Sequence, residues 1–557
     1  MNTDAQTSSK GENRGWPWLS DHEKFPRLGD ARPVIGEFGM VSAPHHQASL
    51  IGLDILRAGG NAVDAAVATS AALMVTLPMQ CSPGGDAIWL VKMPDGAVEV
   101  LDASGRAPAR ADATALRRGG LQSIGHRSAL SVTVPGAVDG WVQALKRHGT
   151  MSLAELLEPA VRLAEEGFFV SRHIHASFLS ALPVLQQWKS MSLWSPDQSA
   201  PRLYEKLKQP KLAAFLRAVG KSGGRALYEG AIADEIAETV TAAGGLLSRD
   251  DLANHRSDWL EPLRIDFRQS TIYTSPPATQ GVALLQALGM IQRLSPEDLN
   301  PMSSASTHLM IEAAAEALAD RDAHVTDRDR LRIDPRTLYS EPHIAAAAKD
   351  FSSGRTRPRE RSTASTKGLG DTAHLAVVDK DHGSVSLIQS LYFDFGSGIP
   401  VHSAGFTLQN RGAAFSLEEG SHKEFKGGAR PPHTLTPSMV LKGNEVSHVI
   451  GCMGGDGQVQ TQLQLLIDMI DAGLDPQQAV SRPRWYLDRA NEAGLQVLVE
   501  EGMEAEVVEG LRQRGHRVAV LGPAEEIMGH AQVIAIEPSG ALVGAADRRS
   551  DGQAIGW

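Results

Sequence analysis

The sequence is poor in cysteine, with Cys81 and Cys452 as the two among 557 residues. Two thiols are too few for a disulfide framework or a four-ligand zinc site, and a single bridge between them stays an open alternative. The net charge of -11 comes without a basic stripe, which argues against nucleic acid as a partner. The longest apolar stretch, 65–78, is interrupted by hydroxyl side chains and is too short to cross a bilayer.

The first 33 residues also lack the basic start and apolar core of a secretory signal. We therefore expect a surface arm at 1–33 on a cytoplasmic protein, with export to the periplasm by an unusual route as the alternative. Apolar residues make up 42% of the chain, which is enough for a sizeable packed core.

Two short motifs that could indicate a cofactor or a metal lack the residues that such sites need. Gly220-Lys221-Ser222 resembles the end of a phosphate loop, but Phe215 stands where that loop requires glycine. The His45-His46 pair has no acidic ligands nearby in the sequence. The sequence therefore predicts neither a metal nor an organic cofactor.

Helical patterns dominate before residue 350, and strand patterns dominate after residue 371. Apolar residues recur at helical spacing at 47–58, 61–72, 152–166, 211–219, 229–243, 281–294 and 304–320. Strand-like runs occur near 86–101 and then at 373–378, 385–392, 438–441, 448–450, 496–499, 518–520, 531–536 and 542–545. Two sheets with helices on their outer faces satisfy this order, so the expected fold class is α+β.

A polar linker at 352–371 separates the two halves and ends at an unusual strand start. The run Gly370–Asp379 places Asp371 and Thr372 where the linker stops. A threonine hydroxyl within a chain is a weak nucleophile, but an N-terminal threonine carries its own base, because its α-amino group has a pKa of ~8. Cleavage between Asp371 and Thr372 would make this run an active site; without cleavage it is merely a strand.

Two glycine- and hydroxyl-rich motifs follow in the second half of the chain. One is His433-Thr434-Leu435-Thr436-Pro437, and the other is Gly451–Gly457, which contains Gly454 and Gly455. Glycines in series leave backbone N–H groups free to point into a cavity, as an oxyanion hole requires. Each glycine run alone is more often a tight turn, whereas the motifs together justify a comparison with a family.

From about Ile35 onward, the chain resembles the γ-glutamyltransferase family of N-terminal-nucleophile hydrolases. The ordered matches are Gly39–His45, Ile55–Ala66, Ser82–Asp86, Val134–Gly140 and Glu158–Phe168. The resemblance implies a four-layer αββα sandwich that is made as a proenzyme and cut into two chains. These chains, a large subunit at 34–371 and a small subunit at 372–557, would remain together as at least a heterodimer.

The resemblance also implies roles for residues around the cut. The Thr372 hydroxyl would attack the Asp371 carbonyl, and the freed amine would then act as base toward a substrate amide. Gly454 and Gly455 would supply the oxyanion donors, and Ser390 matches a family hydroxyl that hydrogen-bonds the nucleophile. His374, two residues further along the strand, either orients Thr372 or is a structural histidine.

The positions that bind the glutamyl group in transpeptidases are changed in this chain. Ser104 stands in place of the arginine that holds the α-carboxylate, and Ala414 in place of the acidic residue that holds the α-amino group. His433 and Thr434 replace paired serines. Each lost charge-assisted contact is worth about 1.5–3 kcal/mol, so efficient glutathione transpeptidation is not expected.

The pattern is similar to the acylase and amidohydrolase branch of the family, which includes cephalosporin (glutaryl-amide) acylases and oxamate amidohydrolases. Both substrate types carry a carboxylate on the acyl side. Arg106 and Arg411 lie near the lost anchors and either clamp that carboxylate or form ordinary ion pairs.

The sequence therefore predicts a self-processing hydrolase of a small-molecule amide such as a glutaryl monoamide, with weak γ-glutamyl transfer as a side activity. Oxamate-like hydrolysis in nitrogen metabolism, a γ-glutamyl hydrolase or transpeptidase, and an unprocessed binding or scaffold protein are the alternatives. No nucleic acid, membrane, metal or organic cofactor is expected to take part.

Overall fold

The computed structural model describes residues 32–294, 303–349, 351, 354–357, 370–491 and 494–557. The predicted arm, 1–33, lies outside the described residues except for its last two positions. The greater part of the predicted linker, 352–371, also lies outside them. Both residues of the predicted cut, Asp371 and Thr372, are described.

One antiparallel sheet holds the predicted cut in a central strand. Its seven described strands follow the order β21-β2-β10-β11-β3-β4-β7. They are β2 Gly39–Ala43, β3 Asp86–Lys92, β4 Val98–Ala103, β7 Asp258–Leu260, β10 Asp371–Asp379, β11 Ser384–Tyr392 and β21 Gln553–Gly556. Every residue of β10 and β11 is buried, because apolar layers cover both faces of the sheet at this point.

A second antiparallel sheet packs face to face on the first. Its seven described strands follow the order β1-β20-β19-β15-β14-β9-β8. They are β1 Val34–Gly36, β8 Leu263–Phe267, β9 Ser270–Thr274, β14 Ser438–Lys442, β15 Glu445–Cys452, β19 Ala531–Ile536 and β20 Leu542–Ala546. An apolar layer that includes Ile88, Val378, Met439 and Ile534 joins the two sheets. Burial of such side chains is the main favourable term that holds the layers together.

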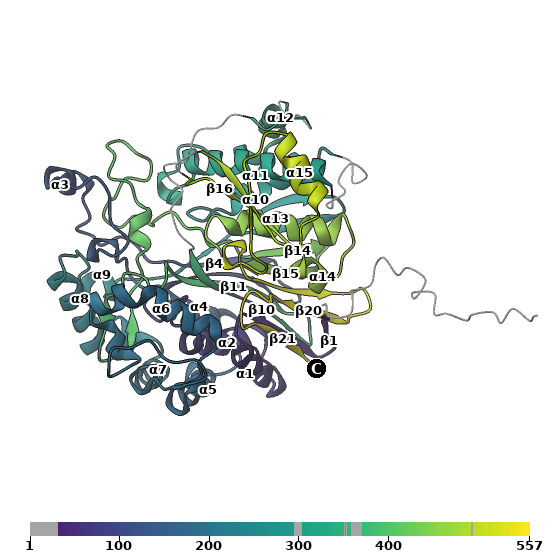
Figure 1. Cartoon of the computed structure of the whole chain (residues 1–557). Coiled ribbons are helices and arrows are strands. Elements are labelled where there is room, and N and C mark those ends of the chain that lie inside the picture. The colour runs from purple at the N-terminus through teal and green to yellow at the C-terminus, as the bar shows by residue number, and fades with distance from the viewer. Residues whose placement is uncertain (1–31, 295–302, 350, 352–353, 358–369, 492–493) are drawn as a thin grey trace, which may run out of the picture.

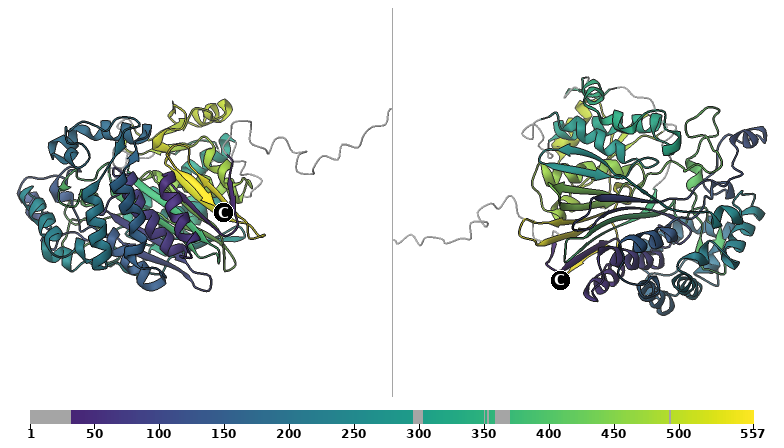
Figure 2. Two further views of the ribbon diagram at one scale, coloured as in Figure 1. Left: turned by 90° about the horizontal axis from the view of Figure 1, so that it is seen from below. Right: turned by 180° about the vertical axis from the view of Figure 1, so that it is seen from behind.

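Helices cover the outer face of each sheet, as Figure 1 and both views of Figure 2 show. The helices on the side of the first sheet are α1 His46–Arg57, α2 Ala62–Thr76, α4 Ala137–His148, α5 Leu153–Glu166, α6 Arg172–Gln187, α7 Pro210–Ser222 and α8 Ala231–Ala242. Those on the side of the second sheet are α10 Gly281–Ile291, α11 Ser304–His324, α12 Glu341–Ala348, α13 Gly457–Ile470, α14 Pro476–Ser481 and α15 Ala505–Gln513. This arrangement confirms the predicted αββα sandwich.

Smaller elements complete the described chain. The short helices are α3 Ala113–Arg118 and α9 Arg249–Ala253. The remaining strands form small sheets, and they are β5 Phe168–Phe169, β6 Lys206–Leu207, β12 Pro400–Val401, β13 Phe406–Thr407, β16 Trp485–Asp488, β17 Gln496–Glu500 and β18 Val518–Leu521. Among the described residues, no helix is both long enough and apolar enough to cross a membrane.

The two cysteines do not form a bridge. Cys81 and Cys452 are both buried free thiols. Cys81 belongs to the core between the first sheet and its helices, whereas Cys452 belongs to the core of the second sheet. Burial raises the pKa of Cys452 to about 12 and raises that of Cys81 further, so both are neutral side chains of the core.

Candidate active site

Thr372 is the second residue of β10 and is buried, with 1% of its surface exposed. The pairing of β10 with β11 shifts register at this point, so that Thr372 alone lies opposite Ser390 and Leu391. The extra residue belongs to β11, and such a bulge changes the direction of side chains on the strand that carries it. The Thr372 hydroxyl thereby meets a hydroxyl of the neighbouring strand.

The Ser390 hydroxyl connects both sides of the predicted cut. Thr372 Oγ1 donates a hydrogen bond to Ser390 Oγ at 3.2 Å, and Ser390 Oγ donates to the carbonyl oxygen of Asp371 at 2.5 Å. The backbone N–H of Tyr392 also donates to Ser390 Oγ, at 2.8 Å. The hydroxyl of Ser390 therefore donates its one proton and accepts with both lone pairs, and these three hydrogen bonds fix its orientation toward the Asp371 carbonyl.

Gly454 and Gly455 form a turn between β15 and α13, beside the predicted cut. Their φ angles of 124° and 54° are left-handed values that favour glycine. The turn touches the chain before Thr372, because a Cβ added to Gly370 would lie 2.9 Å from Gly455 Cα. Within the described chain, neither glycine N–H donates to a protein acceptor. Both donors are therefore available to a negatively charged oxygen.

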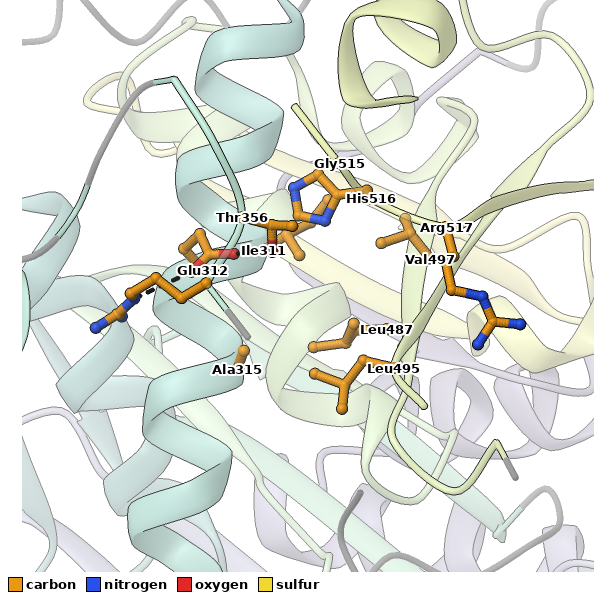
Figure 3. A pocket seen from close by; sticks show the side chains of 11 residues that line it. Ile311, Glu312, Ala315, Thr356, Leu487, Leu495, Val497, Gly515, His516 and Arg517 are labelled. Atoms are coloured by element: carbon orange, nitrogen blue, oxygen red, sulfur yellow. Dashed lines mark hydrogen bonds and ion pairs between the residues drawn. The ribbon is translucent and has the colours of Figure 1, made fainter. Parts of the chain in front are cut away.

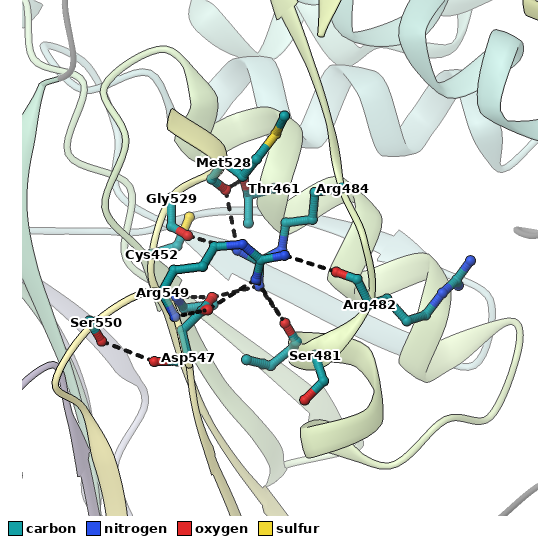
Figure 4. Close-up of polar contacts among 12 residues, drawn as sticks. Cys452, Thr461, Ser481, Arg482, Arg484, Met528, Gly529, Asp547, Arg549 and Ser550 are labelled. Atoms are coloured by element: carbon teal, nitrogen blue, oxygen red, sulfur yellow. Dashed lines mark hydrogen bonds and ion pairs between the residues drawn. The ribbon is translucent and has the colours of Figure 1, made fainter. Parts of the chain in front are cut away.

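A buried ion network around Arg484 and Asp547, drawn in Figure 4, supports this glycine turn through Gly529. Arg484 donates to the carbonyl oxygen of Gly529 at 2.9 Å, and Gly529 in turn packs against Gly454. Asp547 lies 2.7 Å from Arg484 and 3.0 Å from Arg549. Burial by itself raises the pKa of Asp547, but the two guanidinium groups outweigh this effect and hold it at about 2. A charged carboxylate thus anchors the arginine that supports the turn.

Gln280, at the start of α10, joins the glycine turn to the 433–434 motif. Its Nε2 donates to the carbonyl oxygen of Gly455 at 2.9 Å and to that of Thr434 at 2.7 Å. Its Oε1 accepts from Arg321 at 2.6 Å, and Arg321 is paired with Asp456 at 2.7 Å. Gln280 therefore holds together the start of α10, the glycine turn and the 433–434 motif, which are distant in the sequence.

A cavity of ≈ 560 Å³ opens beside the 433–434 motif. Tyr392, Ala414, His433 and Thr434 are among the residues that line it. The cavity also holds Lys423, whose pKa burial lowers to about 8. Of the positions that the sequence analysis associates with substrate, Ala414, His433 and Thr434 therefore line one hollow, whereas Arg106, Arg411, Ser104 and His374 are not among its lining residues.

Residues 48–557 match the family model described as Gamma-glutamyltranspeptidase. The chain belongs to the gamma-glutamyltranspeptidase family. As a member of this family, it is an amidohydrolase enzyme. The family resemblance that the sequence motifs indicated is therefore confirmed.

Three known proteins of this kind are similar to the chain over nearly its whole length. An oxamate amidohydrolase proenzyme of Klebsiella pneumoniae is 37% identical over 531 residues, which cover 94% of this chain and 99% of that protein. A glutathione hydrolase-like YwrD proenzyme of Bacillus subtilis is 36% identical over 534 residues, covering 94% and 99%. The crystal structure of cephalosporin acylase from Bacillus halodurans superposes with a TM-score of 0.88 at 33% identity, covering 96% of this chain and 99% of that one.

Arg411 lies against Tyr392, the residue that pairs with Asp371 at the predicted cut. Its guanidinium carbon lies 4.0 Å above the ring of Tyr392, and its Nη1 donates to Thr434 Oγ1 at 3.4 Å. The side chain is fully buried, and among the described residues its Nε and Nη2 have no hydrogen-bond partner. Burial lowers its pKa to about 10, so the group stays charged at neutral pH. A buried cation with unused donors is suited to an anionic ligand.

Asp86 is a residue beside the predicted cut that the sequence analysis names merely as the end of the family match Ser82–Asp86. It pairs with Ser390 across the β11–β3 ladder and is fully buried. Its Oδ1 accepts from the N–H of Gly105 at 2.8 Å and from Gln409 at 2.9 Å. Its Oδ2 lies 3.4 Å from Nε2 of His433. The carboxylate thus lies beside the imidazole at the cavity wall, a relationship that sequence spacing alone does not reveal.

Arg106 lies apart from this cavity. Its guanidinium is 3.3 Å from Asp258 and donates to the carbonyl oxygen of Gly428 at 3.2 Å, beside a different hollow of ≈ 680 Å³. The nearby Ser104 accepts a hydrogen bond from the buried Arg430, at 3.1 Å. These contacts favour the ion-pair alternative for Arg106.

His374 has contacts that favour its structural alternative. It is fully buried, and its Nε2 lies 2.8 Å from Ser386 Oγ, which donates to the carbonyl oxygen of Ile450 at 3.0 Å on the second sheet. Its ring fills the space above Gly451, where an added Cβ would lie 2.2 Å from a ring carbon. Burial lowers the pKa of His374 to about 3, so the ring is neutral and joins the two sheets.

Proposed function

We propose that this chain cleaves itself between Asp371 and Thr372 and then hydrolyses a small amide that carries a carboxylate on its acyl side. The observation that carries the proposal is the hydrogen-bonded path from Thr372 through Ser390 to the Asp371 carbonyl. Two similar proteins bear names that describe them as proenzymes, which supports processing of this chain as well.

Self-cleavage proceeds by transfer of an acyl group from nitrogen to oxygen. Thr372 Oγ1 attacks the carbonyl carbon of Asp371 and forms an ester as the peptide C–N bond breaks, and the hydroxyl proton passes to the departing amine. The Ser390 hydroxyl stabilises the negative charge that develops on the Asp371 oxygen, to which it already donates. Water then hydrolyses the ester, leaving a new carboxylate on Asp371 and a free α-amino group on Thr372.

The processed enzyme uses the same hydroxyl on its substrate. The free amine of Thr372 accepts the hydroxyl proton as the oxygen attacks the amide carbon, and it then protonates the leaving amine. The N–H groups of Gly454 and Gly455 bind the developing oxyanion, each contributing about 3 kcal/mol to lowering the barrier. Water finally releases the acyl group as a carboxylic acid.

The two subunits produced by the cut would stay together because both sheets contain strands from each. In the first sheet, β10 of the small subunit pairs with β2 of the large subunit, and β11 pairs with β3. In the second sheet, β14 of the small subunit pairs with β9 of the large one. Separation would expose the buried ladders and cores of both sheets, at a large cost in free energy.

Arg411 provides the basis for the proposed substrate class. Its unused donors can bind an acyl-side carboxylate in a bidentate manner, and Thr434, which Arg411 contacts, lines the neighbouring cavity together with His433. The α-amino group of a glutamyl substrate would find the methyl group of Ala414 instead of an anion. A dicarboxylic monoamide, such as a glutaryl amide, fits this set of contacts.

Oxamate-like hydrolysis is the second candidate, and one structural relationship favours it. Arg411 stacks on Tyr392, and Tyr392 pairs directly with Asp371 at the cut. A carboxylate bound by Arg411 would therefore lie close to the nucleophile, as a very short acyl group requires. The identity of 37% to an oxamate amidohydrolase adds to this argument.

Two measurements test these proposals. Denaturing electrophoresis of the purified chain should show two bands, near two-thirds and one-third of the full mass, and mass spectrometry should find Thr372 at the N-terminus of the smaller one. The processed protein should then hydrolyse glutaryl anilide or oxamate faster than γ-glutamyl anilide. A single full-length band would contradict self-cleavage, and a wide preference for γ-glutamyl anilide would contradict the assigned substrate class.

A further inference from the structure

A cluster of two histidines and a glutamate lies on the far side of the second sheet from the predicted cut. His308 and Glu312 are one turn apart on α11, and His516 lies between α15 and β18. All three side chains are buried, and one ligand atom from each lies within 4.8 Å of the other two. Figure 3 shows Glu312 and His516 at the wall of the same small cavity, whose volume is ≈ 150 Å³.

The donor set of this cluster suits a divalent transition-metal ion. Two imidazoles and one carboxylate, with an open fourth position, are typical zinc ligands, whereas Ca²⁺ and Mg²⁺ prefer oxygen ligands throughout. The helical spacing of His308 and Glu312 places both on one face of α11. The adjoining cavity leaves room for a water molecule at the fourth position.

We propose that His308, Glu312 and His516 bind one Zn²⁺ or a similar transition-metal ion. In the structure, His308 Nδ1 lies 2.7 Å from His516 Nε2. Two nitrogens bound to one tetrahedral Zn²⁺ lie about 3.3 Å apart, so the rings separate by roughly 0.6 Å when the ion enters. The proton shared by the facing nitrogens moves to the outer nitrogen of its ring, which leaves both facing nitrogens as ligands.

Arg357 competes with the ion for Glu312. Its Nε donates to Glu312 Oε2 at 3.3 Å, and Thr356 Oγ1 donates to Glu312 Oε1 at 2.7 Å. Arg357 also lies 3.2 Å from Glu316, one turn further along α11. When the ion binds Glu312, repulsion between the two cations favours pairing of Arg357 with Glu316. Removal of the guanidinium should therefore strengthen metal binding.

The proposed ion would also connect the two subunits. His308 and Glu312 precede the cut, and His516 follows it. This step rests on the proposed cleavage, whereas binding of the ion itself does not. A metal bridge across separate chains stabilises the assembly by the free energy of binding.

The test is calorimetric titration of the chelator-treated, full-length protein with Zn²⁺. We expect about one ion per chain for the wild type, and a loss of affinity of at least about 100-fold in a His308→Gln, His516→Gln double variant. His402→Gln removes an exposed histidine and is the matched control, with binding expected to be unchanged. Equal binding by the wild type and the double variant would overturn the proposal.

Three further measurements complete the test. Co²⁺ added to the wild type should give the visible absorption bands of a tetrahedral site, and their absence would contradict the assignment without any variant. Arg357→Gln should raise Zn²⁺ affinity several-fold, and unchanged or weaker binding would refute the competition. Thr372→Ala should bind Zn²⁺ as the wild type does, which separates this site from the fate of the proposed cleavage.

Discussion

The hydroxyl of Thr372 lies 3.2 Å from the hydroxyl of Ser390, on the neighbouring antiparallel strand. The same Ser390 hydroxyl is held by the carbonyl oxygen of Asp371, the residue on the other side of the peptide bond that we propose is cut. One side chain therefore contacts both the attacking group and the group attacked. This relationship leads to the first two predictions.

Thr372→Ala should abolish both self-cleavage and amide hydrolysis, because it removes the attacking oxygen of each reaction. Thr372→Ser keeps that oxygen and should retain both activities. The two variants can be compared by denaturing electrophoresis and by hydrolysis of the amide panel. Hydrolysis that survives in the alanine variant would refute the assignment of the nucleophile.

Ser390→Ala should slow self-cleavage by roughly 10- to 100-fold, since it leaves the buried Asp371 carbonyl and Thr372 hydroxyl without their shared partner, at about 1–3 kcal/mol. Time-resolved electrophoresis of freshly refolded protein measures the rate. Ser386→Ala is the matched control, because it removes another buried hydroxyl of β11 that binds His374 instead of Thr372. Equal slowing in both variants would indicate a general effect on the strand.

Gly370→Ala should also impair maturation. The added Cβ would lie 2.9 Å from Gly455 Cα, so either the cut site or the glycine turn must move, at a cost of about 1–3 kcal/mol. At Gly125 an added Cβ would find its nearest neighbour at 3.9 Å, so Gly125→Ala is the control. If both variants mature at the wild-type rate, contact between the cut site and the turn does not matter for cleavage.

Arg411→Gln should reduce kcat/KM for amides with an acyl-side carboxylate by about 10- to 100-fold, which corresponds to one charge-assisted contact of about 1.5–3 kcal/mol. An uncharged acyl anilide of similar length should lose far less. Arg106→Gln should have little effect, because Arg106 is paired with Asp258 beside a different hollow. The opposite ranking of the two arginine variants would reverse their assignment.

Acid should destabilise the protein through its buried histidines, of which His374 is the one in β10. Burial lowers the pKa of His374 from 6.5 to about 3. Between these values the unfolded chain binds a proton that the folded chain does not, so stability falls as pH falls, by up to about 1.4 kcal/mol per pH unit.

His374→Gln should therefore flatten the dependence of Tm on pH between about pH 6 and pH 4. His402→Gln, at an exposed position, should leave the slope unchanged. Differential scanning calorimetry across this range measures both variants. The same slope for His374→Gln and the wild type would show that this histidine does not titrate on unfolding.

The sequence predicted several elements well because their signals are local. The helix expected at 152–166 is found as α5, Leu153–Glu166, where Ser152 and Glu155 form a capping box. By contrast, α13 was not predicted, because its polar face is buried too. Glutamines of that helix bind backbone groups elsewhere in the chain, as Gln462 does with the Thr436 carbonyl at 2.7 Å. Such partners are not visible in a local pattern.

The sequence alone was sufficient for the family and, through that resemblance, the αββα architecture, because the ordered motifs are properties of the chain itself. The polar linker before Thr372 is likewise what led to the proposal that this residue is the nucleophile. The tertiary structure decided which polar residues meet. It placed Asp86 opposite Ser390, brought Gln280 to Gly455 and Thr434, and separated Arg106 from Arg411. Strand pairing and packing between layers create these contacts across long sequence separations, and residue spacing does not encode them.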